Sequence, residues 1–108
     1  MQYEALLTQF GYAISPSTLA QIERVVTNTV GFKQVEKHLL ALHDTLQVHH
    51  SFVALSNNQD YFKIKNEALG EAMIDEVNEI IEKWSEKYKI SLEKVLNKNT
   101  YYVIGYKA

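Results

Sequence analysis

The sequence contains no cysteine, which excludes disulfide bonds, thiolate nucleophiles and metal centres built on sulfur. A small domain without disulfides depends on its packed core, and this fits a reducing compartment. The first ten residues lack a basic segment and include Glu4, so they do not resemble a secretory signal. We therefore expect a soluble, cytoplasmic protein.

Long apolar runs are also missing. The longest aliphatic runs, such as that at 39–42, are only a few residues, far short of the roughly 20 that cross a bilayer, so we expect no membrane partner. The formal net charge of −2 gives no general reason to expect a nucleic acid or an anionic surface as partner. The 108 residues, 46% of them hydrophobic, predict a single globular domain spanning 1–108.

Proline and glycine are scarce, so each one marks a boundary between elements. Ser15 and Pro16 suit the N-cap and the first position of a helix, while Gly11 and Gly31 suit helix ends. Apolar spacing predicts the remaining elements. The expected helices span 1–10, 16–30, 32–50, 66–88 and 90–98, and the expected strands span 51–56, 61–65 and 99–107.

This series has the order α-α-α-β-β-α-α-β. A sheet of two or three strands cannot bury its apolar face alone. The predicted fold class is therefore α+β, mostly helical, with the helices packed on one face of a small antiparallel sheet. Residues 51–56 would form an edge strand that invites completion of the sheet by another subunit.

All four histidines lie between residues 38 and 50: His38, His43, His49 and His50. No two of them have the spacing of three or four that would bracket one metal ion on a helix, so we expect neither a metal nor another cofactor. His49 continues the apolar seam of the helix. We expect it to be partly buried, and more buried than the other three histidines.

Acidic residues repeat every four positions along the predicted helix over 66–88. We interpret this stripe as a solvated face, with acids toward the positive end of the helix dipole and lysines toward the other end. The alternatives are a cation site or a surface for a basic partner. The stripe comprises Glu67, Glu71, Asp75 and Glu79.

Aromatic and basic residues alternate along the predicted strands. A sheet face that carries them would form a platform for stacked bases, with lysines for the phosphates. Against this interpretation, the chain has a single arginine, Arg24, and nucleic-acid sites favour arginine. The expected face comprises Tyr61, Lys63, Lys65, Tyr101 and Lys107.

Three functions remain open. The first is a non-catalytic protein with a regulatory or adaptor role, which acts through protein–protein interaction and self-associates, as a homodimer, through the long helix or the C-terminal strand. The second, less favoured, is a nucleic-acid-binding module that uses the lysine–tyrosine face. The third is a metal-binding or enzyme site on the histidine-bearing helix. It is the least favoured because the sequence has no phosphate loop and no nucleophile motif.

Overall fold

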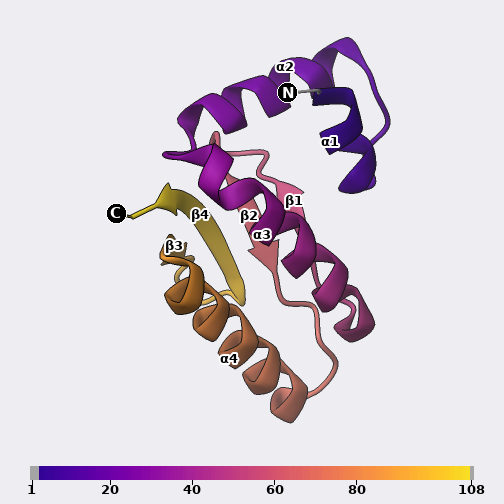
Figure 1. The fold of residues 1–108 in the computed structure, drawn as a ribbon. Coiled ribbons are helices and arrows are strands. Elements are labelled where there is room, and N and C mark those ends of the chain that lie inside the picture. The colour runs from indigo at the N-terminus through magenta and orange to yellow at the C-terminus, as the bar shows by residue number, and fades with distance from the viewer. Residues whose placement is uncertain (1–2, 108) are drawn as a thin grey trace.

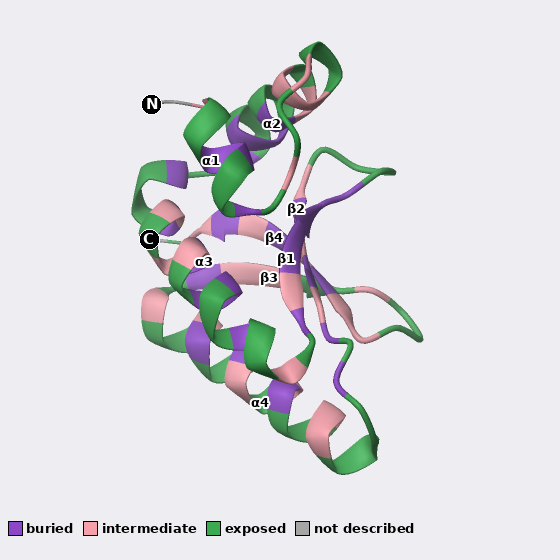
Figure 2. Ribbon diagram, turned by 90° about the vertical axis from the view of Figure 1, so that its right-hand side faces the viewer, coloured by how far each residue is buried: buried purple, intermediate pink, exposed green. Residues whose placement is uncertain are grey.

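The computed structural model describes residues 3–107. Within that range the chain forms four α-helices, one 3-10 turn and four strands, and the helices lie on one side of the sheet (Figure 1, Figure 2). The predicted fold class, α+β with helices packed on one face of an antiparallel sheet, is confirmed. The elements are α1 (Tyr3–Gln9), α2 (Pro16–Asn28), α3 (Phe32–Leu46), η1 (Gln47–His49), β1 (Phe52–Leu55), β2 (Phe62–Lys65), α4 (Glu71–Tyr88), β3 (Ile90–Lys94) and β4 (Thr100–Tyr106).

The four strands pair in the order β1-β2-β4-β3, and every pair is antiparallel. In the β2–β4 pair, Lys63 lies opposite Tyr102 and Ile64 lies opposite Tyr101. Directly opposed residues point to the same side of a sheet. Lys63 and Tyr102 therefore share one face, and Ile64 and Tyr101 share the other.

The hydrophobic core fills the space between the helices and one sheet face. Phe62 is fully buried there. Its ring lies 5.5 Å from the ring of Phe10 and 5.7 Å from that of Phe32, so α1, α3 and β2 meet at one aromatic cluster. Aromatic contacts at these distances stabilise the folded state by more than the burial of their area alone.

None of the helices in residues 3–107 is long and apolar enough to cross a membrane.

The start of α2 agrees with the prediction. The Ser15 hydroxyl accepts a hydrogen bond from the Thr18 N–H at 3.1 Å, and the Thr18 hydroxyl accepts one from the Ser15 N–H at 2.9 Å. Pro16 follows at the first helical position. This reciprocal cap satisfies two backbone donors that a helix otherwise leaves free. The predicted helix over 1–10 is α1, although residues 1 and 2 lie outside the described range.

The long helix begins later than predicted. Asn66 does not cap it, because α4 starts at Glu71 with Gly70 before it. The buried Asn66 side chain instead donates to the Ile74 carbonyl and to the Asn78 side chain, both at 2.9 Å. These bonds hold the connection from β2 to α4 in place.

The segment predicted as a helix over 90–98 is the strand β3 followed by a turn, and this prediction was wrong. Lys89 ends α4 in the left-handed conformation, with φ of 56°, and this reverses the chain. Leu92 then pairs with Val103, and Ile90 pairs with Tyr106. Ladder hydrogen bonds and burial of Ile90 outweigh the local capping preference of Ser91.

Candidate functional site

The His43 side chain is buried and hydrogen-bonded within the protein. It is only 4% exposed. Its Nδ1 accepts a hydrogen bond from the Val53 N–H at 3.0 Å, and its Nε2 lies 2.9 Å from the Gln47 side-chain amide. A neutral ring that accepts at Nδ1 carries its proton on Nε2, and Nε2 then donates to Gln47 when the amide is turned so that its oxygen faces the ring. Burial lowers the pKa of His43, so the structure favours this neutral form.

The expected ranking of the histidines was wrong. His43 is buried, whereas His49 is only partly buried. The reason is that α3 ends at Leu46 and the chain tightens into η1, so His49 leaves the helical seam. His43 lies on the side of α3 that faces β1, as its bond to Val53 shows.

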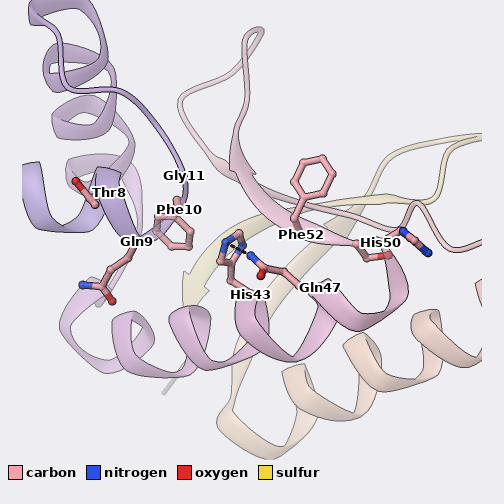
Figure 3. Close-up of a pocket in the computed structure, with 9 residues that line it drawn as sticks. Thr8, Gln9, Phe10, Gly11, His43, Gln47, His50 and Phe52 are labelled. Carbon is pink, nitrogen blue, oxygen red and sulfur yellow. Dashed lines mark hydrogen bonds between the residues drawn. The ribbon is translucent and has the colours of Figure 1, made fainter.

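A hollow of about 430 Å³ lies beside His43 and also reaches His50 (Figure 3). An acid–base site would need a carboxylate near one of these rings. None of the nine residues that line the hollow is an aspartate or a glutamate, and both ring nitrogens of His43 already have partners. Within residues 3–107, no group of three or more side chains is placed to hold a metal ion.

The strand β1 is an edge strand, as expected for residues 51–56. The backbone N–H groups on its outer edge nevertheless have hydrogen-bond partners within the chain. The Val53 N–H bonds to His43, and the Leu55 N–H bonds to the Tyr12 hydroxyl at 2.8 Å. An edge strand normally offers such groups to another chain. Here α1, α3 and their connections cover that edge with side chains.

The other candidate surface is the sheet face that the helices leave uncovered, which we call the open face (Figure 2). The strand register decides which side chains lie on it. Tyr61 joins it just before β2, with its ring 5.5 Å from that of Tyr102. The open face comprises Phe52, Ala54, Tyr61, Lys63, Lys65, Glu93, Thr100 and Tyr102.

Two of the five residues expected on this face lie elsewhere. Tyr101 is 3% exposed on the helix side, and its hydroxyl donates to the Glu82 carboxylate at 2.8 Å. Burial, reinforced by that bond, raises the pKa of Tyr101. Lys107 lines a hollow together with Tyr101 and Glu82, also on the helix side. Since β4 is apolar on both faces, sequence parity alone could not orient it.

The open face has a small pocket of about 100 Å³ between the two hairpin turns. Lys98 from the β3–β4 turn lines it beside Lys63 and Lys65, and sequence reasoning missed this third lysine. Burial lowers the pKa of Lys63, and the charges of Lys65 and Lys98 lower it further. Lys65 also lies 3.4 Å from the Glu67 carboxylate. The pocket can therefore attract an anionic group beside Tyr102.

The predicted acidic stripe is only partly on the helix: Glu71, Asp75 and Glu79 are exposed on α4, whereas Glu67 precedes it because α4 begins later than predicted. Glu79 forms an ion pair of 2.7 Å with Lys83, one turn further along α4. Such a fully exposed pair contributes little to stability, because solvent screens it.

No protein-family model matches this chain, and no curated protein or solved structure that was compared with it is significantly similar.

Proposed function

We propose that this chain is a non-catalytic interaction protein of the cytoplasm that binds a partner protein through the open face. The observation that carries the proposal is the half-buried aromatic pair of Tyr61 and Tyr102, which lies on a sheet face that none of the described helices covers. Exposed aromatic side chains at the centre of a patch are typical of protein interfaces.

The charges around that centre favour an acidic partner. Lys63, Lys65 and Lys98 line one small pocket with Tyr102. Two acids lie near them: Glu93, which the register places on the same face, and Glu67, which pairs with Lys65. A symmetric pair of open faces would bring lysines toward lysines, and like charges across an interface oppose binding. A second copy would therefore have to offer another surface, and the exposed acids of α4 are one.

Site-specific photo-crosslinking tests the proposal in cells. A benzoyl-phenylalanine probe replaces Tyr102 on the open face, and in a matched control it replaces Thr45, which is exposed on α3. We expect one dominant protein adduct from position 102, weakened when Lys63→Gln and Lys65→Gln are added. Native mass spectrometry of the adduct then separates a second copy from a different protein. Equal adducts from both positions, or none from position 102, would contradict the proposal.

A second candidate function is single-stranded nucleic-acid binding, which the tyrosine pair beside three lysines also favours. Bases stack on aromatic rings, and each stacked base is worth about 1–3 kcal/mol. At low salt, a labelled oligonucleotide should show an anisotropy change that Tyr102→Ala and Lys63→Gln both reduce. No change with the protein at tens of micromolar would exclude this function.

A further inference from the structure

The first half of α3, the end of α4 and the end of β4 meet near the C-terminal end of the described chain (Figure 1). A hollow of about 400 Å³ lies among these elements. Its size is within the usual range for sites that bind small molecules, roughly 300–1,000 Å³. We propose that this hollow binds a small phosphorylated molecule, whose phosphoryl group is held by Lys37, Lys87 and Lys89.

The charges of the lining residues support an anionic ligand. Lys37, Lys87 and Lys89 line the hollow together with His38, and no aspartate or glutamate does. In the described part of the chain, none of the three lysines lies within 4.0 Å of a carboxylate oxygen. Burial lowers the pKa of His38, and the charges of Lys37 and Lys87 lower it further. These lysines thus lie beside the imidazole, and no side-chain carboxylate of residues 3–107 pairs with them.

The helix dipole explains the lysines of α4 but not Lys37. Lys87 and Lys89 lie at the C-terminal end of α4, where the helix dipole favours positive charge. Lys37 lies in the second turn of α3, where the dipole has little effect. Its spacing of four residues from Lys33 brings like charges together. An anion in the hollow would offset this repulsion at Lys37.

The walls of the hollow are already ordered. The His38 ring stacks on the Tyr88 ring at 3.8 Å between centroids, and the Trp84 indole N–H donates to the His38 carbonyl at 3.1 Å. The Lys87 ammonium lies 5.3 Å from the centre of the Tyr88 ring. The Lys89 carbonyl accepts from the Lys107 N–H at 2.8 Å. Binding therefore requires little ordering of the site beyond the lysine tips.

The ligand class follows from the donors and the shape. Ammonium groups bind phosphate as compact point charges. The hollow is bounded by two helices and the end of β4, which suits a small molecule rather than a polymer. The site lies among the helices, on the opposite side of the sheet from the open face, so the proposal is independent of the proposed function.

Inorganic pyrophosphate is the probe, and the imidazole signals of the intact protein in NMR are the readout. We expect saturable binding that raises the pKa of His38, because a bound anion stabilises the imidazolium. The paired substitution Lys37→Gln and Lys87→Gln should weaken binding by about tenfold or more. The matched control, Lys83→Gln with Lys94→Gln, removes two exposed lysines that line neither this hollow nor the open-face pocket, and it should leave pyrophosphate binding beside His38 unchanged.

Three results would overturn the proposal. One is the absence of saturable binding at millimolar pyrophosphate. Another is equal weakening by the two paired substitutions, which would indicate a general charge effect. The third is tighter binding of a single-stranded oligonucleotide than of pyrophosphate, if that binding is lost in the Lys37→Gln and Lys87→Gln variant. The hollow would then be part of a nucleic-acid-binding surface. Circular dichroism of each variant checks that its fold is retained.

Discussion

The imidazole Nδ1 of His43 accepts a hydrogen bond from the Val53 N–H at 3.0 Å, which ties α3 to the outer edge of the sheet. The same ring packs edge-on against Phe10 at 5.2 Å. One side chain thus joins α1, α3 and β1 and occupies a backbone donor that an edge strand would otherwise expose. This bond requires an unprotonated Nδ1, so it makes the stability of the fold depend on pH.

We predict that acid destabilises the protein through His43. Its pKa in the folded state is lowered by burial from an ordinary value of 6.5. The unfolded chain therefore binds more protons below about pH 6.5, and the free energy of unfolding falls as the pH decreases from there to the folded-state pKa. Above that range the contribution is constant. Urea unfolding between pH 8 and pH 5 measures the effect.

The variant His43→Leu separates this contribution from those of other groups. At neutral pH the substitution should lower the free energy of unfolding by about 1–3 kcal/mol, because the Val53 N–H loses its partner. The free energy of unfolding of this variant should also change less between pH 7 and pH 5 than that of the parent. The exposed His50, changed to glutamine, is the control and should keep the parent's pH dependence. An unchanged pH dependence in His43→Leu would exclude His43 as the source.

A second prediction concerns Tyr12, whose hydroxyl caps the Leu55 N–H at 2.8 Å. Tyr12→Phe keeps the ring and leaves that donor without a partner, so it should cost about 1–2 kcal/mol. Amide hydrogen exchange should become faster at Leu55 while remaining unchanged at Ile64 in the neighbouring strand. Equal exchange at Leu55 in both proteins would show that water replaces the hydroxyl at no cost.

A third prediction compares two glycines. Gly105 has a φ of +147°, and a Cβ atom there would lie 2.5 Å from the Val30 carbonyl oxygen, whereas a Cβ atom at Gly11 would meet nothing within 4 Å. Gly105→Ala should therefore cost about 3 kcal/mol, since the strand must move away from Val30. Gly11→Ala should cost only about 1–2 kcal/mol, for its left-handed backbone. Thermal unfolding of both variants measures the difference.

A fourth prediction tests the orientation of β4. Tyr101 is buried against Glu82, and Tyr102 lies on the open face. Tyr101→Ala should cost about 3–5 kcal/mol, as other large core residues do. Tyr102→Ala should cost about 1 kcal/mol, mostly through its contact with Tyr61. Chemical denaturation measures the free energy of unfolding of both variants. A larger loss for Tyr102→Ala than for Tyr101→Ala would mean that Tyr102, and not Tyr101, faces the core.

Local signals in the sequence were sufficient where neighbours along the chain decide the structure. The cap at Ser15, with Pro16 after it, places the start of α2, because both effects act within one helical turn. Alternation in residues 61–65 orients Phe62 inward and Lys63 outward, because only one face of that strand is apolar. The fold class followed from the same patterns.

The incorrect predictions share one physical cause, which is pairing between segments that are distant in the sequence. Residues 90–94 carry a helix-capping signal, yet they form β3 because β4 offers hydrogen bonds and a buried place for Ile90. The inward turn of Tyr101 follows from its register with Ile64, and β4 itself is apolar on both faces. His43 and Val53 are joined although the chain between them turns from helix to strand.

The sequence by itself determined the fold class, most of the helices and the alternation of Tyr61, Lys63 and Lys65 with apolar residues, since these depend on spacing and on residue type. Only the tertiary structure decided which side chains share a surface. It placed Tyr102 and Lys98 beside Lys63, and it brought Lys37 of α3 toward Lys87 of α4. The reason is that strand register and helix packing are set by contacts between segments, and no local pattern records them.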